Sequence, residues 1–455
     1  MPLTKDQVDD AIEALLETAR KRDPDQPEFL QALEEIVTSL RPALPSLGAP
    51  YVKALERMIE PESVVQFRVP WVDDQGTEQV NRGWRVLLST AVGPGKGGLR
   101  FRNNVTLGTL KFLALEQALK NALTTLPMGA AKGGSDFDPA GKSDREVQAF
   151  CQSFMTSLYR HIGPDVDVPA GDIGVGGREI GYLFGQYKRI TGHFNGTLTG
   201  KGPTFGGSLM RPEATGYGAV FFLSHVLNSA DKSLDGLRVY VSGSGNVAQN
   251  AAVKLTELGA HVASLSDSAG TVFFGDKGAD MDTLEAVKEL KNVQRGRLSD
   301  LTLPDGAEYV ADAQPWSRVG KGDVVFPCAT QNEIDDETGK KLADVGILAL
   351  AEGANMPTSN GALQAFLDAG VLVAPAKATN AGGVAVSGLE MSQNAQHLSW
   401  TAARVTEELE RIMADIFQAC QSAAEKAGVP GNLVAGANIA GFVKVAEAMI
   451  AQGTV

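Results

Sequence analysis

Several residue types that would mark a particular class of protein are scarce in this chain of 455 residues. Its three cysteines, Cys151, Cys328 and Cys420, lie far apart without CxxC or Cys/His ligand spacing, so neither a disulfide framework nor a zinc site is expected. No uninterrupted apolar run approaches the roughly 20 residues that span a bilayer. Acidic residues outnumber basic ones, and the formal net charge of −13 argues against nucleic acid or an anionic membrane as the main partner.

What remains is the composition of a globular protein rich in tight turns, with 43% hydrophobic residues and 51 glycines. A chain of this length is expected to form two or three domains. The N-terminal sequence MPLTKDQVDDAIEALLETARKR has the spacing of an acidic amphipathic helix and lacks the basic start and apolar block of a signal peptide. We therefore expect a cytoplasmic protein.

Two kinds of pattern follow one another along the chain. Residues 5–60 carry apolar positions at helical spacing, and the following runs VVQFRVPWV and VNRGWRVLLST flank a turn-forming stretch, as in a hairpin. After Pro212, short apolar runs such as LRVYVSG, HVASLSD, DVVFPCA and ILALAEG mostly alternate with helical stretches. This alternation predicts an α/β fold with a parallel sheet whose ligand loops follow the carboxyl ends of the strands.

The segment LRVYVSGSGNVAQNAAVKLTELGAHVASLSD indicates a dinucleotide site. A strand runs into a GxGxxA turn, a helix follows, and a second strand ends in an acid at about the expected offset. The glycines permit a tight turn and close approach of a pyrophosphate to the helix N-terminus. The turn residues predicted to bind the cofactor are Gly243, Ser244, Gly245, Asn246 and Val247. The alternative is a helix-capping turn that binds nothing.

The residues alone leave the choice of cofactor open. Asp267, at the end of the second strand, would accept a hydrogen bond from a ribose hydroxyl and repel a 2′-phosphate, which favours NAD. Its neighbours Ser266 and Ser268 could instead donate to a phosphate, and Arg295 or Arg297 could supply positive charge, which favours NADP.

A group of cations stands out in this acidic chain. Its members are Lys96, Arg100, Arg102, Lys111, Lys120, Lys132 and Lys142. We place Lys96 and Lys132 in glycine-rich turns, GPGKGGLRF and MGAAKGGSD, where small neighbours leave room for a ligand. Lys111 and Lys120 fall on opposite faces of one predicted helix, so only one can serve a given site, whereas Gln117 and Lys120 share a face. The alternative for Lys120 is a surface pair with Glu116.

Two further loops combine polar residues with glycine. In DVPAGDIGVGG, Asp172 precedes a predicted helix and is either a helix cap or a general acid or base tuned by nearby lysines. In ATNAGGVAVSGLEMSQN, we place Asn380 and Ser387 before a helix in a similar way.

Together these stretches resemble the glutamate dehydrogenases of the hexameric bacterial and fungal type. The resemblance runs from about residue 10 to the C-terminus and includes GPGKGGLRF, LPMGAAKGGSDFDP, DVPAGDIGVGGREIGYL, RPEATGYG, CATQNEI, AEGANMP and TNAGGVAVSGLEMSQN. It implies reversible oxidative deamination of glutamate to 2-oxoglutarate and ammonia, in a homohexamer. The motif Ser266-Asp267-Ser268 resembles that of NADP-using members, so NADP is expected rather than NAD.

The resemblance also implies a role for individual residues. Lys132 would be the catalytic lysine, which loses its proton easily and activates water, and Asp172 would be the partner acid that carries protons to and from ammonia. The residues implied to hold substrate are Lys96 and Ser387 for the side-chain carboxylate, and Gln117, Lys120 and the backbone of Gly171 for the α-carboxylate end. Those implied to touch the cofactor besides the glycine turn, Asp267 and Ser268 are Thr215, Asn355 and Asn380.

The expected architecture has two domains with the active site in the cleft between them. An α/β substrate-binding and oligomerisation domain covers 1–206 and is rejoined by 430–455, and a Rossmann-type domain covers 207–429. The chain departs from the family pattern at Gly95, where an aromatic residue is usual, so Lys96 would be held less firmly, and at Ala130 and Ala131, where glycines are common.

Two other functions compete with this one. A dehydrogenase of an apolar amino acid such as leucine or phenylalanine would share the lysine and the aspartate, but it has no reason to bury Lys96 and Ser387 beside the substrate. A dinucleotide-binding sensor or scaffold would bind the cofactor without turnover and would leave Lys132 and Asp172 unexplained.

Overall fold

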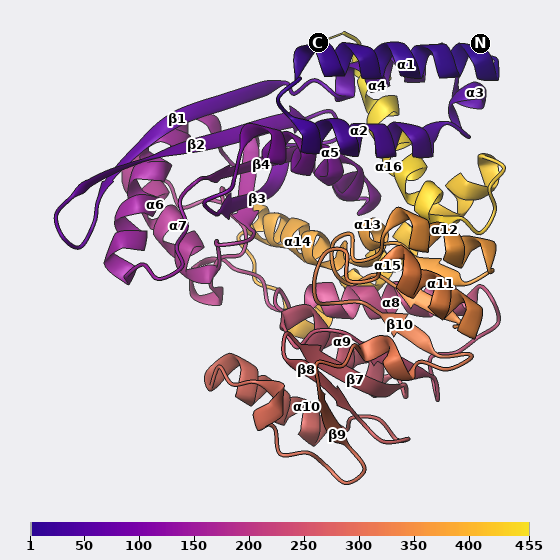
Figure 1. The fold of residues 1–455 in the computed structure, drawn as a ribbon. Coiled ribbons are helices and arrows are strands. Elements are labelled where there is room, and N and C mark those ends of the chain that lie inside the picture. Colours follow the sequence, from indigo (N-terminus) through magenta and orange to yellow (C-terminus); the bar gives the residue numbers. More distant parts are fainter. Residues whose placement is uncertain (1, 455) are drawn as a thin grey trace.

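The computed structural model describes residues 2–454 and contains two β-sheets, each with its own helices (Figure 1). The first has five strands in the order β1-β2-β4-β3-β5, and the second has seven in the order β12-β11-β10-β6-β7-β8-β9. The elements around the first sheet are α1 (Lys5–Arg22), α2 (Pro27–Leu40), α3 (Leu44–Leu47), α4 (Ala49–Met58), β1 (Ser63–Val72), β2 (Glu78–Ser89), β3 (Gly95–Phe101), α5 (Leu107–Leu123), β4 (Ala130–Ser135), α6 (Asp144–Leu158), β5 (Asp167–Gly171) and α7 (Gly177–Thr191).

The second sheet follows from residue 214 onward. Its elements are α8 (Ala214–Asn228), β6 (Arg238–Val241), α9 (Asn246–Glu257), β7 (His261–Asp267), β8 (Gly270–Phe273), α10 (Met281–Lys288), a π-helical turn (Glu289–Val293), β9 (Glu308–Ala311), β10 (Val324–Phe326), α11 (Asp336–Val345), β11 (Ala349–Ala351), α12 (Asn360–Asp368), β12 (Leu372–Ala374), α13 (Ala376–Thr379), α14 (Gly382–Gln396), α15 (Ala402–Lys426) and α16 (Leu433–Gln452). Strands β6, β7, β10, β11 and β12 run parallel, whereas β8 and β9 add an antiparallel edge. The predicted α/β fold with a parallel, helix-covered sheet is confirmed.

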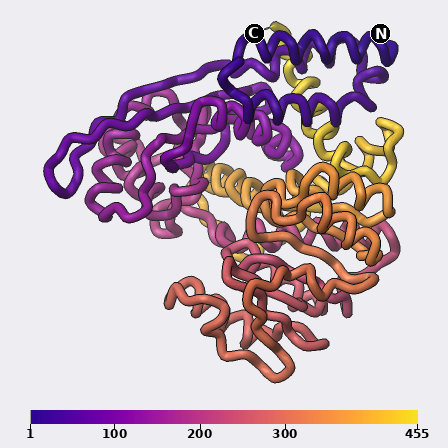
Figure 2. Tube along the Cα trace, viewed as in Figure 1, coloured from indigo at the N-terminus to yellow at the C-terminus, as the bar shows by residue number. Residues whose placement is uncertain are grey.

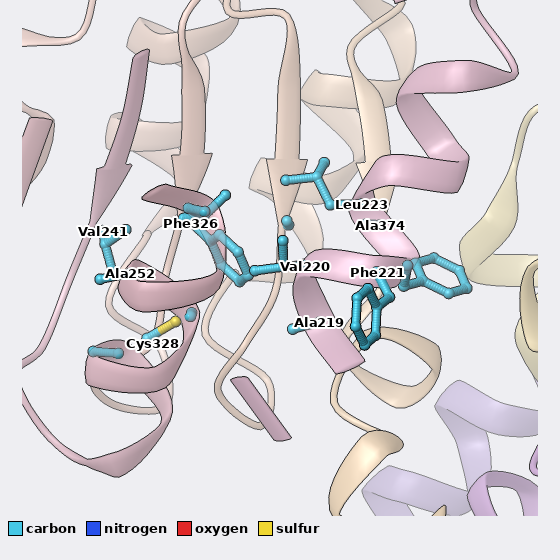
Figure 3. Close-up of a cluster of buried hydrophobic side chains, with 14 of the residues drawn as sticks. Ala219, Val220, Phe221, Leu223, Val241, Ala252, Phe326, Cys328 and Ala374 are labelled. Carbon is cyan, nitrogen blue, oxygen red and sulfur yellow. The ribbon is translucent and has the colours of Figure 1, made fainter. Parts of the chain in front are cut away.

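The core of the second sheet forms between its strands and the long helices α8, α9 and α15. Val220 and Leu223 of α8 and Phe326 of β10 are all fully buried in this cluster, which Figure 3 shows in part. The strands contribute near-continuous apolar runs because both faces of a parallel sheet are covered by helices. This core holds the carboxyl ends of β6 and β10 in fixed positions beside the cleft described below.

The glycine-rich stretches around Lys96 and Lys132 form strands, not the predicted turns. Lys96 lies in β3 and Lys132 in β4, which run parallel to each other inside the first sheet. The glycines allow the backbones to approach, because a Cβ at Gly97 would lie 1.7 Å from the Ala131 carbonyl oxygen and one at Gly134 would lie 2.3 Å from that of Arg100. Strand propensity disfavours glycine, so local sequence alone points away from these strands.

A buried ion pair joins three strands of the first sheet. Arg85 of β2 donates through Nε to Asp167 Oδ2 of β5 at 2.6 Å, and through Nη1 to the carbonyl oxygen of Gly97 in β3 at 3.0 Å. A Cβ at the neighbouring Gly95 would lie 2.4 Å from Leu87 Cδ1 and 2.9 Å from Asp167 Oδ1. The space that a larger residue would need at position 95 is thus already occupied by Leu87 and by this ion pair.

The chain returns at its C-terminal end to the N-terminal helices. In Figure 2 the yellow end of the tube lies beside the indigo start, and α16 packs against α2, α4, α5 and α15. By length and composition α16 could cross a membrane, the one such helix among the residues described, but 50% of its most apolar window is buried inside the protein. Such burial is typical of a core helix.

Candidate active site

A cavity of about 490 Å³ lies between the two sheets and collects most of the predicted site residues. Strands β3, β4 and β5 and helix α5 supply one wall; α8, α13, α14 and the loops after β10 and β11 supply the other. The predicted residues that line this cleft are Lys96, Gln117, Lys120, Lys132, Gly171, Asp172, Thr215, Val247, Asn355, Asn380 and Ser387. Gly243, Ser244, Gly245, Asn246, Asp267 and Ser268 lie outside it, along the adjoining turn and strand end.

Lys132 and Asp172 face each other in the cleft. The Lys132 Nζ lies 3.3 Å from Asp172 Oδ2, and Arg100 Nε donates to the same oxygen at 2.8 Å. Burial lowers the pKa of Lys132 more than Asp172 raises it, and Arg100 and Arg85 lower it further. Burial also favours the neutral form of Asp172, but Lys132 and Arg100 outweigh that effect and keep the pKa of the carboxyl below its ordinary value. An ionised carboxylate therefore faces a lysine that loses its proton more easily than it would in water.

The loop at the end of β5 directs Asp172 into the cleft. The Asp172 carbonyl oxygen accepts from Val175 N at 2.8 Å, and Gly174 has a φ of +75° and would, with a Cβ, collide with the Phe101 carbonyl oxygen at 2.0 Å. Helix α7 is capped by Glu179, whose Oε2 accepts from Gly176 N at 2.8 Å. The alternative in which Asp172 caps this helix is therefore not what the structure forms.

Lys96 and Ser387 lie at one end of the cleft with Arg211, a residue that the sequence interpretation missed. Lys96 is 1% exposed, and burial together with the nearby Arg211 lowers its pKa to about 7. Ser387 Oγ lies 2.6 Å from Thr199 Oγ1. Ser387 also lies inside α14, and not before it as predicted, because this helix already begins at Gly382.

The charges at this end do not balance. Nearby, Lys201 and Glu390 form a fully buried ion pair at 2.9 Å, and Glu390 Oε2 also accepts from Gly200 N at 2.9 Å. Within residues 2–454 no carboxylate lies at ion-pair distance from Lys96 or Arg211, and Glu390, which is paired with Lys201, acts on both only at longer range. A buried cation without a partner costs several kcal/mol. An anionic ligand at this end of the cleft would neutralise Lys96 and Arg211.

Gln117 and Lys120 lie on α5, in the same wall as Lys96 and Lys132. Lys120 Nζ donates to Asn380 Oδ1, and burial followed by the neighbouring Lys132 lowers its pKa to about 8. Glu116, its alternative partner, pairs instead with Lys377 at 3.3 Å. The predicted separation of the two helix lysines is confirmed.

Lys111, on the other face of α5, belongs to the N-terminal helices. Its Nζ lies 2.7 Å from Asp23 Oδ2 and 4.3 Å from the centre of the Phe29 ring. It therefore has a structural role away from the cleft.

The glycine turn after β6 fits a dinucleotide. Gly243 has a φ of +81° and donates its N–H to Ser266 Oγ at 2.8 Å. Gly245 precedes α9 without a side-chain cap, and nothing lies within 4 Å of where its Cβ would be. Free amides at a helix N-terminus beside open space are what a pyrophosphate requires. Asn246 donates from Nδ2 to the Pro212 carbonyl oxygen at 2.6 Å.

Asp267 is already occupied by protein donors. Its Oδ1 accepts from Ala269 N and its Oδ2 from Leu298 N, each at 2.9 Å, while Lys291 Nζ lies 3.5 Å away. Arg297 Nη1 donates to Ser268 Oγ at 2.7 Å. The carboxylate therefore anchors a segment that brings Lys291 and Arg297 beside Ser268. Lys291 was missed because it lies in a π-helical turn remote from Asp267 in sequence.

A glycine turn that fits a dinucleotide lies at the carboxyl edge of one sheet, and the other sheet carries a pocket with unpaired cations and a lysine–aspartate pair. This is the arrangement of a nicotinamide-dependent dehydrogenase. The geometry places this protein in that class.

Comparison with known proteins narrows the class. The family model described as Glutamate/Leucine/Phenylalanine/Valine dehydrogenase matches residues 206–453, and the model for the dimerisation domain of the same family matches residues 61–189. The chain belongs to this family.

Individual relatives are similar over nearly the whole length. The NADP-specific glutamate dehydrogenase of Giardia intestinalis is 54% identical over 98% of this chain and 99% of that protein, and the NADP-specific enzyme of Escherichia coli K12 is 53% identical over the same shares. A NAD-specific glutamate dehydrogenase also matches, at 50% identity. The crystal structure of Plasmodium falciparum glutamate dehydrogenase superposes with a TM-score of 0.95 at 50% identity, covering 98% of this chain and 96% of that one.

Proposed function

We propose that the protein catalyses the reversible oxidative deamination of L-glutamate to 2-oxoglutarate and ammonia with NADP, and serves ammonia assimilation in the reverse direction. The observation that carries the substrate assignment is the pair of cations without partners, Lys96 and Arg211, at one end of the cleft. A dicarboxylate places one carboxylate there, near Ser387, and the other near Gln117, Lys120 and the Gly171 backbone. The close relatives named NADP-specific glutamate dehydrogenase support the same assignment.

In this proposal Lys132 and Asp172 move protons at the reacting carbon. Asp172, ionised at neutral pH, accepts a proton from the substrate amino group and returns it to the departing ammonia. Lys132, whose ammonium form is destabilised by burial, takes a proton from the water directed at Cα. Lys96 and Lys120 orient the substrate through its two carboxylates. Arg100 fixes the Asp172 carboxylate through its 2.8 Å hydrogen bond.

NADP, when bound, supplies the hydride acceptor. The uncapped turn at Gly243, Ser244, Gly245, Asn246 and Val247 would hold its pyrophosphate, with Thr215, Asn355 and Asn380 near the other end. Asp267 acts indirectly by anchoring the segment that carries Lys291 and Arg297. With Ser268, these cations favour a 2′-phosphate, which supports NADP over NAD.

Dehydrogenation of an apolar amino acid is the nearest alternative within the family. An apolar substrate would leave the buried Lys96 and the half-buried Arg211 unpaired in the complex, whereas a second carboxylate neutralises them. The dicarboxylate is therefore the better match to this cleft.

The domain boundaries and the assembly are part of the proposal. Residues 1–206 together with 430–455 would form the substrate and oligomerisation domain, and 207–429 the Rossmann-type domain; the packing of α16 against α5 supports the return of the chain. A homohexamer is supported by the family's dimerisation-domain model and by a structural neighbour, 28% identical, that is described as hetero-hexameric. Val64, Val72 and Val80, exposed on the β1–β2 hairpin, offer apolar surface for such contacts. We place the enzyme in the cytoplasm.

One spectrophotometric assay tests the activity. The enzyme is given 2-oxoglutarate and ammonia with NADPH, then with NADH, and then with a branched apolar keto acid in place of 2-oxoglutarate. We expect fast oxidation of NADPH in the presence of ammonia only when the keto acid is 2-oxoglutarate. Faster turnover of the apolar keto acid would refute the substrate assignment, and a preference for NADH would refute the cofactor assignment.

A further inference from the structure

A buried carboxyl group outside the proposed chemistry lies behind the cofactor half of the cleft. Glu352 follows β11 directly and is only 3% exposed. Its Oε2 accepts from Ala376 N at 2.8 Å, while its Oε1 has no hydrogen-bond partner among the residues described. The hydroxyl of Thr358 lies beside the carboxyl group and is likewise without a partner in hydrogen-bond geometry. Buried polar groups are nearly always satisfied, so this arrangement needs an explanation.

Glu352 connects two segments that line the cleft. Ala376 opens α13, and its carbonyl oxygen accepts from Asn380 N at 2.9 Å. The Asn380 side chain donates in turn to Asn355 Oδ1 at 2.8 Å and to the Ala354 carbonyl oxygen at 3.2 Å. The carboxyl group thus closes a ring of hydrogen bonds from the loop after β11 through α13 and back to the same loop.

We propose that Glu352 is a positioning residue for the cofactor half of the cleft, which it fixes by joining the loop after β11 to the N-terminus of α13. It touches neither substrate nor cofactor; it acts through Asn355 and Asn380, which line the cleft. The inference rests on the proposed use of this half of the cleft by NADP.

The protonated form of Glu352 suits this position best. Burial raises the pKa of the carboxyl to about 7, and the Ala376 amide and the adjacent Thr358 offset only part of this rise. The groups that face it, Ala376 and Thr358, are uncharged. The neighbouring Lys377 directs its ammonium group to Glu116 and Asn438 and not to Glu352. A proton on Oε1 would let it donate to the Thr358 hydroxyl, which satisfies both groups. Because the pKa is raised on folding, this stabilisation is complete at acid pH and is lost as the pH rises through about 7.

The test compares two substitutions at Glu352 with a control. Glu352→Gln keeps an acceptor for Ala376 N and mimics the protonated group, whereas Glu352→Ala removes the connection. Glu146→Ala is the matched control, since Glu146 is also a buried helix-capping carboxylate, accepting from Ser143 N at 3.0 Å, but belongs to α6 and does not line the cleft. NADPH affinity is measured by fluorescence titration between about pH 6 and pH 8.5, and hydrogen exchange is followed at the amides of 376–380.

We expect Glu352→Ala to weaken NADPH binding about tenfold, the usual size for loss of a buried hydrogen bond, and to speed exchange in 376–380. Wild-type affinity should fall several-fold as the pH rises through about 7, whereas Glu352→Gln should bind as the wild type does at pH 6 and show no such fall. Glu146→Ala should lower stability and leave NADPH affinity unchanged.

Wild-type NADPH affinity in Glu352→Ala, or a Glu352→Gln variant as impaired as Glu352→Ala, would overturn the inference. Should Glu352→Ala fail to fold, the pH dependence of Glu352→Gln decides alone. The titration involves no turnover, so a protein that binds NADPH but does not act on glutamate would refute the proposed reaction without deciding the role of Glu352.

Discussion

The two walls of the cleft bind their ligands by different physical means. The wall from the first sheet carries Lys96, Lys120 and Lys132, buried cations whose pKa values are lowered by burial. The turn that adjoins the opposite wall relies on backbone geometry, with a positive-φ glycine at 243 and an uncapped helix N-terminus. The Asp267 carboxylate on this side is already bound by protein donors.

This contrast reflects the two ligands. A small diacid offers little surface, so its binding depends on charges that stay unsatisfied until it arrives. A dinucleotide offers a long backbone, and many modest contacts can hold it. Substitutions on the first wall should therefore have large effects on turnover and selectivity, and substitutions on the second wall should have smaller effects.

The largest effect is expected at Lys132. Lys132→Ala removes the group that takes a proton from water, and kcat should fall by about 10²- to 10⁴-fold while NADPH binding persists. Steady-state kinetics and a fluorescence titration measure the two quantities. Lys142→Ala is the control, since this lysine lies 5.7 Å from the Trp71 ring and does not line the cleft. Near-wild-type kcat in Lys132→Ala would end the assigned role.

The next effect concerns selectivity. Lys96→Ala should weaken discrimination between glutamate and norvaline by about 2–5 kcal/mol, the range for removing one partner of a buried charge pair. The ratio of kcat/KM for the two amino acids measures it. An unchanged ratio would mean that Lys96 does not hold the side-chain carboxylate.

Lys96 should also lower the stability of the ligand-free protein, because its buried charge has no partner. Lys96→Met should raise the free energy of unfolding of the ligand-free protein by about 1–4 kcal/mol. The gain should grow as the pH falls from about 10 to 7, because a lysine whose pKa drops to about 7 on folding destabilises the native state increasingly over that window. Denaturant titrations at several pH values test this, and a destabilised variant would contradict it.

The smallest effect is expected on the second wall. Arg297→Ala removes an exposed cation beside Ser268 and should lower the preference for NADPH over NADH by about 1 kcal/mol. The ratio of kcat/KM for the two cofactors is the measurement, with Arg411→Ala, on the distant surface of α15, as the control. An effect as large as that of Lys96→Ala would show that the two walls do not differ as described.

Sequence reasoning captured the parts of the molecule that local pattern encodes. The strand–turn–helix unit around Gly243 follows from glycine spacing and apolar runs, and the α/β alternation predicted the second sheet. The strands holding Lys96 and Lys132 were mistaken for turns, because their glycines are explained only by the neighbouring strands. Local sequence pattern reflects the strand propensity of each residue, and the glycines of β3 and β4 have a low strand propensity.

The site shows the same limit. Lys132, Asp172 and several other residues of the quoted motifs line the cleft, whereas Arg211, although it begins the motif RPEATGYG, and the Thr199 hydroxyl were not singled out because tertiary folding brings them there. Arg100 was named among the cations, but its contact with Asp172 was not predicted. Its position four residues after Lys96, on the same face of a strand, was the available signal. The shared face of Lys96 and Arg100 can be recognised only once residues 95–101 are known to form a strand.

The ion pair between Arg85 and Asp167 has a consequence for genetics. Both side chains are sealed in the interior, at 2% and 0% exposure, and neither lines the cleft. Yet they bind strand β3 on either side of Lys96, through the Gly97 carbonyl oxygen and the pairing of Asp167 with Gly95. A random-mutagenesis survey scored for growth on ammonia should recover inactive alleles at these two positions, although neither residue contacts a ligand.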